Sequence, residues 1–477
     1  MEVSKNADCI LVKPPIVEYE TKFKNLSKYQ YGQIPPLGLL YIAAALEEKN
    51  ISVHVIDAEA EKLSLKACLK EIKKRSPSLV GVTAMSTFVN TSASLLSYVK
   101  SIDNSILTFM GGPHPTILPE KTLKNYQYID AVIRGEGEHT TSELCNYYLS
   151  GIGDLTKIKG ISFRKKNKII TTPDRPLIKD LDTLPFPARH LLSLNKYKIN
   201  TIYGERGITT TMSTSRGCPF NCAFCGQPFG NITRFRSPDS TISEIREIVS
   251  LGINHILFID DTMTANKERM HKILDYMIRE DSGIQWACTT RVDCIDESLL
   301  VKMKKAGCIK VDFGIESGNQ KILDLIQKRI TLEQARHAVK IAKKAGLDVV
   351  TYFMLGHPGE TKDTIEDTIQ FACELNPDVA QFAVHIPLPG TKTWEFAKNN
   401  EHGLELLTDD LNNIGKYGGK AIIRVNDLSE YDLVKYQNIA FKRFYLRPEY
   451  ILTRVLQLKN RVKFVNTIKA GWLYISG

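Results

Sequence analysis

The chain has 477 residues, more than one ordinary domain needs, and 43% of them are hydrophobic. Its 63 Lys and Arg residues outnumber its 53 Asp and Glu residues, giving a formal net charge of +10. No apolar run reaches the roughly 20 residues that would span a bilayer, and no secretory leader is visible. We therefore expect a multidomain cytoplasmic protein with reduced cysteines.

Residues 1–150 alternate short apolar runs with amphipathic ones, which predicts a doubly wound, Rossmann-like α/β domain. The predicted strands are 10–13, 52–56, 79–83, 106–110 and 131–134, and the predicted helices are 38–49, 65–75, 92–101 and 140–150. Such sheets bind ligands at the carboxyl ends of their strands. No G-x-G-x-x-G follows the first strand, which argues against a nicotinamide or flavin dinucleotide.

Residues 151–204 are predicted to link this domain to the next. Residues 157–172 indicate a short hairpin with basic side chains. Residues 180–188 contain Leu-Pro-Phe-Pro, whose prolines favour an extended backbone over a helix.

Residues 205–400 repeat a strand–helix pattern about six times. The predicted strands are 209–213, 255–260, 285–290, 310–315, 348–355 and 380–386, and the helices between them include 240–250, 297–306, 332–345 and 364–375. Six units fall short of the eight in a closed barrel, so the pattern predicts a partial (β/α)6 TIM-like barrel. Catalytic residues of such barrels lie on the loops after the strands.

The loop after the first barrel strand contains Cys218, Cys222 and Cys225 at C-x3-C-x2-C spacing. Three thiolates on one short loop can hold three irons of a [4Fe–4S] cluster, which usually takes four cysteines. No fourth cysteine lies near, so we expect the fourth iron to be open to a small molecule. Structural zinc is the alternative, but no nearby residue completes a four-ligand set. The other cysteines are expected to be small buried hydrophobes: Cys9, Cys68, Cys145, Cys288, Cys294, Cys308 and Cys373.

Polar residues follow the other barrel strands, where an apolar core does not explain them. They include Asp260, Asp261, Arg291, Asp293, Gly314, Glu316 and Ser317. For the acids, helix capping or an ion pair is the simpler explanation, most of all for Asp260 and Asp293. Glu316 stands between glycines, which allow a ligand to approach closely.

Residues 401–477 are predicted to form a helical extension rich in Lys and Arg among aromatics and leucines. The simplest explanation is a solvated cap over the barrel. An interfacial helix that draws the protein towards anionic lipid is an alternative, which would make the protein membrane-peripheral. Nucleic-acid binding is disfavoured because no recognition fold accompanies the charge.

With Phe224 as its aromatic residue, the cysteine loop resembles the C-x3-C-x-aromatic-C motif of radical S-adenosylmethionine (SAM) enzymes. The resemblance implies that the open iron binds SAM and that reductive cleavage gives a 5′-deoxyadenosyl radical. Arg291 would bind the SAM carboxylate through its planar fork. The SAM contacts implied for this chain are Phe224, Gly226, Asp261, Arg291, Glu316 and Ser317.

The first domain resembles the cobalamin-binding domain of B12-dependent radical SAM proteins in three segments: 35–39, 111–114 and 134–138. The implied cobalamin contacts are Pro14, Pro15, Gly38, Ser86, Thr87, Gly111, Gly112 and Glu136. Residues 12–25 lack Asp-x-His-x-x-Gly, so the resemblance implies cobalamin without a histidine lower ligand. We expect His114 to be structural, because prolines flank it in a turn. A Rossmann-like domain without a corrin remains an alternative.

The resemblance implies hydrogen abstraction from an unactivated carbon, followed by methyl transfer from methylcobalamin. The group it resembles includes the anaerobic magnesium-protoporphyrin ester cyclases and hopanoid methylases, so radical ring closure on a lipophilic substrate is the alternative activity. A corrin or redox sensor is a third hypothesis. The implied partners are a small-molecule or lipid substrate and a one-electron reductant such as flavodoxin or ferredoxin, but no nucleic acid.

Overall fold

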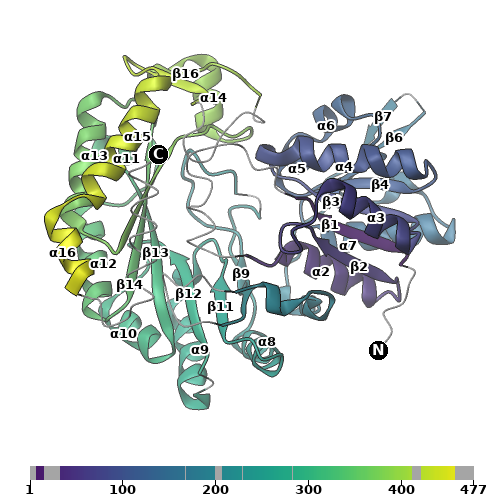
Figure 1. The fold of residues 1–477 in the computed structure, drawn as a ribbon, viewed down its shortest axis with the longest axis horizontal. Coiled ribbons are helices and arrows are strands. Elements are labelled where there is room, and N and C mark those ends of the chain that lie inside the picture. The colour runs from purple at the N-terminus through teal and green to yellow at the C-terminus, as the bar shows by residue number, and fades with distance from the viewer. Residues whose placement is uncertain are drawn as a thin grey trace. The chain divides into compact units, whose positions relative to one another are not determined.

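The computed structural model describes residues 7–15, 33–166, 168–198, 207–227, 229–281, 283–410 and 421–456. These residues form two compact units, one ending at Tyr197 and the other beginning at Lys198 (Figure 1). Each unit contains one large sheet with helices packed against it.

The first unit is built on a seven-stranded sheet with the order β2-β1-β3-β4-β5-β6-β7. Its parallel strands are β1 (Cys9–Lys13), β2 (Val53–Asp57), β3 (Leu79–Thr83), β4 (Leu107–Gly111) and β5 (Ala131–Ile133). The long helices are α2 (Leu37–Glu47), α3 (Leu65–Arg75), α4 (Val89–Ile102) and α7 (Gly137–Ser150). The predicted Rossmann-like fold is confirmed. Two short helices that we did not predict, α5 (Pro113–Ile117) and α6 (Pro119–Asn125), follow β4 and begin with prolines.

The segment expected to be a linker contributes two strands to this sheet. The hairpin of β6 (Ile161–Lys165) and β7 (Lys168–Thr171) forms where a hairpin was predicted. However, β6 also pairs antiparallel with β5. The pairing satisfies backbone groups along β5 that would otherwise be left at a sheet edge.

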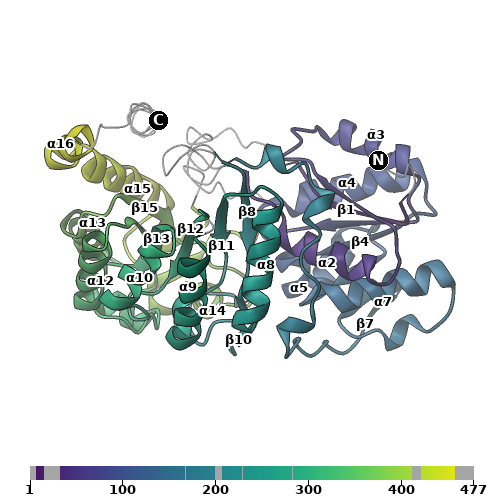
Figure 2. The same ribbon diagram turned by 90° about the horizontal axis from the view of Figure 1, so that it is seen from below.

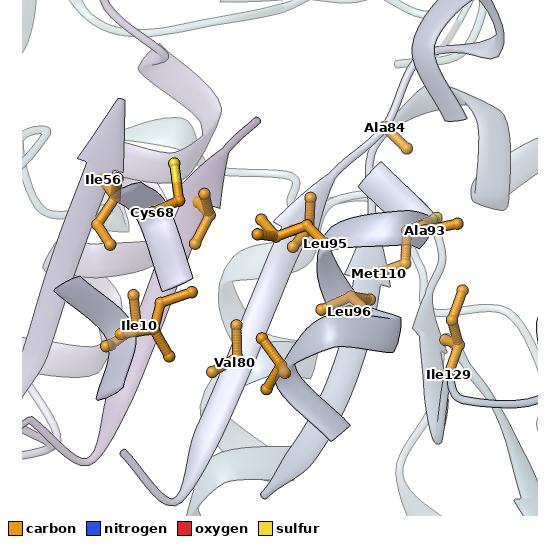
Figure 3. Packing of buried hydrophobic residues seen from close by; sticks show 14 of the residues in the cluster. Ile10, Ile56, Cys68, Val80, Ala84, Ala93, Leu95, Leu96, Met110 and Ile129 are labelled. Carbon is orange, nitrogen blue, oxygen red and sulfur yellow. The ribbon is translucent and has the colours of Figure 1, made fainter. Parts of the chain in front are cut away.

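Both faces of the first sheet are covered by apolar side chains. Alternate residues of β1 belong to opposite clusters, with Ile10 on one face and Leu11 on the other. Figure 3 shows the first cluster, where Ile10 and Val80 of the sheet lie among residues of α3 and α4 such as Cys68 and Leu95. Burial on both faces explains why these strands read as continuous apolar runs in the sequence.

The second unit is built on a six-stranded parallel sheet with the order β15-β14-β13-β12-β11-β8. Its strands are β8 (Thr209–Met212), β11 (His255–Phe258), β12 (Gln285–Thr290), β13 (Cys308–Glu316), β14 (Asp348–Leu355) and β15 (Val379–Val384). Helices α8 (Pro238–Ser250), α9 (Lys267–Glu280), α10 (Glu297–Lys305), α12 (Leu332–Lys344) and α13 (Lys362–Leu375) line its outer side (Figures 1 and 2). The predicted partial barrel is confirmed.

Beyond the barrel, the C-terminal part is not helical throughout. Strands β16 (Leu404–Leu406) and β17 (Ile423–Val425) pair antiparallel before α15 (Glu430–Tyr445) and α16 (Pro448–Leu456). Helix α15 packs on the outer side of β15, where the Phe441 and Phe382 ring centroids lie 5.5 Å apart. The remaining basic residues of the predicted extension, within 457–477, lie outside the described residues. In the described part of the chain, no helix has the length and apolar character needed to cross a membrane.

Most of the cysteines outside the loop after β8 are buried, as predicted. Cys9, Cys68, Cys145, Cys288 and Cys308 are fully enclosed, whereas Cys294 and Cys373 are half-buried.

Candidate functional site

The three-cysteine loop after β8 is held by backbone hydrogen bonds. The Cys218 amide donates to the Gly230 carbonyl at 3.2 Å. The Ala223 amide donates to the Ile326 carbonyl at 2.8 Å, and the Ala223 carbonyl accepts from the Thr393 amide at 3.0 Å. The loop is therefore fixed to the segments that follow β13 and β15. Cys218 and Cys222 are half-buried, and Cys225 is exposed.

Polar groups approach two of the three sulfurs. A guanidinium N–H of Arg291 lies 3.8 Å from Cys222 Sγ, and Thr262 Oγ1 lies 3.8 Å from Cys218 Sγ. Burial raises the pKa of the Cys222 thiol, while the charges of Lys328 and Arg291 act to lower it. Cationic and hydrogen-bonding neighbours suit the thiolates that ligate an iron–sulfur cluster.

The spacing of the three thiols matches the chemistry of a cluster. Among the described residues, no group of three His, Cys, Asp or Glu side chains is placed to hold one metal ion. An iron–sulfur cube needs no such convergence, because each iron takes its own cysteine. The donor set therefore fits a [4Fe–4S] cluster with one sulfur for each of three irons.

Arg291, after β12, is held in place by several contacts. Its Nε and Nη2 donate to the two carboxylate oxygens of Asp293, each at 2.9 Å, and Nη2 also donates to the Lys328 carbonyl at 2.8 Å. Its guanidinium lies 3.7 Å from the centroid of the Phe220 ring. With the contact to Cys222, these bonds use most of the five donors of the side chain. The Arg291–SAM contact stays a prediction.

Glu316, at the end of β13, forms a buried ion pair with Lys328, with Oε1 and Nζ 2.9 Å apart. The register of β13 and β14 shifts between Gly314 and Glu316, and Glu316 has a φ of 76°. A Cβ at Gly314 would lie 2.5 Å from Glu316 Oε1, so the glycine leaves room for the carboxylate. Ser317 is buried, and its hydroxyl lies 3.2 Å from Thr368 Oγ1 of α13.

The two neighbouring aspartates after β11 have different surroundings. Asp260 is buried and accepts hydrogen bonds from the Thr214 amide at 3.1 Å and from the Ser215 hydroxyl at 2.5 Å. It fixes the start of the cysteine loop, which is a structural role other than the helix capping we considered. Asp261 is exposed, and its carboxylate accepts from the Gly217 amide at 3.2 Å. Asp261 is thus the aspartate available to a ligand beside the loop.

Phe224 and Gly226 occupy the end of the cysteine motif. Lys328 Nζ lies 5.8 Å from the centroid of the Phe224 ring. Gly226 is exposed, and a Cβ there would meet only Thr391 Cγ2, at 4.0 Å. The Phe224 ring centroid also lies 5.9 Å from that of His357.

Sequence reasoning missed several polar residues near this loop. Lys328 gave no signal because it lies in a connecting segment whose burial only the fold determines. His357, Glu360 and His385 follow β14 and β15 and are fully buried. Burial raises the pKa of Glu360 to about 8, although Glu360 accepts a hydrogen bond from the His357 amide at 3.1 Å. The Gly-His-Pro-Gly-Glu segment follows a predicted strand, but nothing in its sequence shows that the fold buries its histidine and glutamate.

In the first unit, the candidate cobalamin residues gather along the carboxyl edge of the sheet. Pro14 and Pro15 follow β1, and Ser86 and Thr87 follow β3. Gly111 ends β4, Gly112 follows it, and Glu136 precedes α7. Gly38 is exposed in the first turn of α2, and a Cβ there would meet no atom within 4 Å.

At this edge of the sheet, the backbone of Gly112 lies close to the backbone of Ala84. Its φ is 102°, and a Cβ would lie 2.8 Å from the Ala84 carbonyl oxygen, so only glycine fits. His114 Nδ1 lies 3.0 Å from Ser86 Oγ, and burial lowers the pKa of His114 to about 4. These contacts fit the structural role expected for His114.

Glu136 has a structural contact as well. Its carboxylate accepts a hydrogen bond from the buried amide of Ile178 at 2.7 Å. The loops after β1, β3 and β4 lie at the carboxyl ends of parallel strands, where sheets of this kind bind their ligands. The prediction of cobalamin without a histidine lower ligand concerns residues 12–25, most of which lie outside the described residues.

Comparisons with known proteins agree with this architecture. The model of the radical SAM superfamily matches residues 212–372, and the model of the B12 binding domain matches residues 29–145. An uncharacterized methyltransferase of Pyrococcus horikoshii is 37% identical over 89% of this chain and 90% of its own. The anaerobic magnesium-protoporphyrin IX monomethyl ester cyclase of Rubrivivax gelatinosus is 32% identical over 75% of this chain and 65% of its own.

Two solved structures share the fold. The radical SAM methyltransferase TsrM of Kitasatospora setae, solved with cobalamin and a [4Fe–4S] cluster, has a TM-score of 0.69 at 20% identity and covers 86% of this chain and 81% of its own. The cobalamin-dependent SAM radical enzyme OxsB has a TM-score of 0.72 at 17% identity, and the match covers 91% of this chain and 66% of its own. The chain belongs to the radical SAM superfamily, among the members with a B12-binding domain. It is a radical SAM enzyme whose cofactors are a [4Fe–4S] cluster, SAM and cobalamin.

Proposed function

We propose that this enzyme transfers a methyl group, supplied by SAM, to an unactivated carbon of a small-molecule substrate. The observation that carries the proposal is that one chain contains both the three-cysteine loop of a radical SAM domain and a B12-binding domain. The Pyrococcus relative, itself named a methyltransferase, supports it. When bound, the cluster would supply an electron to SAM, and cobalamin would carry the methyl group.

The protein's part in this reaction is binding and orientation. Cys218, Cys222 and Cys225 would ligate the cluster, and Arg291 would donate to the Cys222 thiolate. The remaining predicted SAM contacts would lie along the strand ends around that loop. The cobalamin would be held by the strand-end loops of the first unit, without a histidine ligand. Electrons would come from an external one-electron donor such as a flavodoxin or ferredoxin.

Radical ring closure without methyl transfer is the second candidate, favoured by the Rubrivivax cyclase similarity. Methyl-labelled SAM separates the two activities, since label enters the product only in methylation. Label retained in methylated cobalamin and absent from every product would contradict the proposal. A redox sensor, the third hypothesis, would form no deoxyadenosine from SAM.

A cysteine variant tests the assignment of the cluster. Cys222→Ala should abolish SAM cleavage, because one iron loses its ligand, while cobalamin binding to the other unit persists. Deoxyadenosine is measured by chromatography and bound cobalamin by its visible absorbance. The matched control is Cys373→Ala, which removes a half-buried cysteine of α13 outside the motif. Continued SAM cleavage by Cys222→Ala protein would refute the assignment.

A further inference from the structure

The concave face of the barrel sheet carries polar side chains on neighbouring strands. Phe353 of β14 and Phe382 of β15 stack with ring centroids 5.4 Å apart, and Phe382 contacts Phe441 of the outer helix α15. Alternate residues of a strand point to opposite faces. Tyr352 and Gln381 therefore lie on the concave face, away from α15.

Gln381 stands beside Tyr352 in the strand register. The Gln381 side chain is only 3% exposed, and neither its oxygen nor its nitrogen has a hydrogen-bond partner among the described residues. A buried amide without a partner is unfavourable, and such groups in native proteins usually meet a water or a ligand. The amide of Gln381 is therefore available to an occupant of the concave face.

The charged groups beside this amide are already balanced. Lys310 and Asp312 of β13 form a buried ion pair 2.9 Å long, and the Tyr352 hydroxyl donates to Asp312 at 3.0 Å. A charged ligand group would remain without a counterion in this buried setting. A neutral group with both a donor and an acceptor matches the glutamine amide.

The polar surface continues towards the cysteine loop. His385 directly follows the last residue of β15, and its Nε2 has no hydrogen-bond partner in the described structure. Burial lowers the pKa of His385 to about 3, so the ring is neutral. Its centroid lies 5.2 Å from that of His357, which in turn lies against Phe224 of the cysteine loop.

We propose that Gln381 and Tyr352 form a substrate subsite that hydrogen-bonds an uncharged polar group, either an amide or a hydroxyl. The inference rests on the proposed function, because it assigns the class of substrate for that reaction. The substrate is then a polar small molecule rather than a hydrocarbon lipid.

Acetamide is a direct probe of the subsite, with acetate as the charged analogue. Saturation-transfer NMR on the full-length reconstituted protein should detect acetamide and not acetate. The near-isosteric variant Gln381→Met should lose the acetamide signal, and Gln381→Asn, which keeps the amide, should retain part of it. The control is Gln437→Met, which changes a buried glutamine that donates to the Phe382 carbonyl at 2.8 Å from the outer face.

Equal acetamide signals from wild-type and Gln381→Met protein would overturn the proposal, and so would acetate binding as well as acetamide. A second measurement follows methyl label from SAM into a small-molecule extract. After SAM and cobalamin are removed, labelled product in the aqueous phase supports the subsite, and label confined to the chloroform phase overturns it. Absence of label in both phases would count against methyl transfer, and the acetamide measurement would still decide the subsite.

Discussion

Replacing Arg291 with glutamine should lower the midpoint potential of the iron–sulfur cluster. The guanidinium lies 3.8 Å from Cys222 Sγ, so the substitution removes both a positive charge and an N–H···S hydrogen bond. At an effective dielectric constant of about 20, a unit charge about 4 Å away contributes about 4 kcal/mol. Asp293 opposes much of this field, because its carboxylate lies 2.9 Å from the same guanidinium.

The added electron is also spread over the whole cluster, which leaves a net effect of about 1 to 2 kcal/mol. For a one-electron couple, this corresponds to a shift of about 40 to 90 mV towards negative potential. The assay is a potentiometric titration of the reconstituted protein without SAM, followed by electron paramagnetic resonance. Arg291→Lys keeps the charge but not the planar fork, so its shift should be smaller.

The matched control is Arg336→Gln, which removes an arginine that pairs with Glu374 on the outer surface and should leave the potential unchanged. Iron content and circular dichroism show whether each variant is loaded and folded. An unchanged potential in Arg291→Gln, together with weaker SAM binding, would refute the reasoning. Arg291 would then act on the SAM carboxylate, as the family resemblance implied.

Three further predictions concern stability of the cluster-free protein, measured as thermal midpoints. The pKa of Glu360 is raised to about 8, so its contribution to stability is present at low pH and is lost as pH rises from about 5 to 8. Wild-type protein should therefore lose up to about 4 kcal/mol of stability over this range, and Glu360→Gln protein should not. Parallel pH profiles of the two proteins would contradict this prediction. Lys328→Met leaves Glu316 buried without its cation and should cost about 3 to 5 kcal/mol, partly recovered by adding Glu316→Gln; an unchanged midpoint would mean that the pair is solvated. Gly81→Ala places a Cβ 2.2 Å from the Phe109 ring and should cost about 1 to 3 kcal/mol, whereas an undiminished midpoint would show that the ring moves freely.

The strands of both sheets could be predicted because local pattern and global fold agree in them. In β14, for example, the apolar run of residues 348–355 is bounded by glycines, and the strand has those limits. Helix α5 was missed because the prolines beside His114 suggested a turn, although proline also suits the first position of a helix. The pairing of β6 with β5 was missed because register between distant segments leaves no local pattern.

The site divides in the same way. The cysteine loop could be recognised because its three ligands lie within eight residues of each other. The Glu316–Lys328 pair joins a strand end to a connecting segment, and the Gln381 amide is unusual only because the fold buries it. Neither feature has a short spacing that sequence reasoning could detect. Interpreting Asp260 needed the fold too, since its partners lie more than forty residues earlier in the chain.

The hairpin of β6 and β7 makes β7, instead of β5, the outer strand at one edge of the first sheet. Strand β7 has only four residues, and lysines 165, 166 and 168 gather at the tip of the hairpin. Short outer strands with lysine side chains are poor templates for a second chain, because pairing would bring like charges together. The hairpin should therefore protect this enzyme from edge-to-edge aggregation while the chain is newly made.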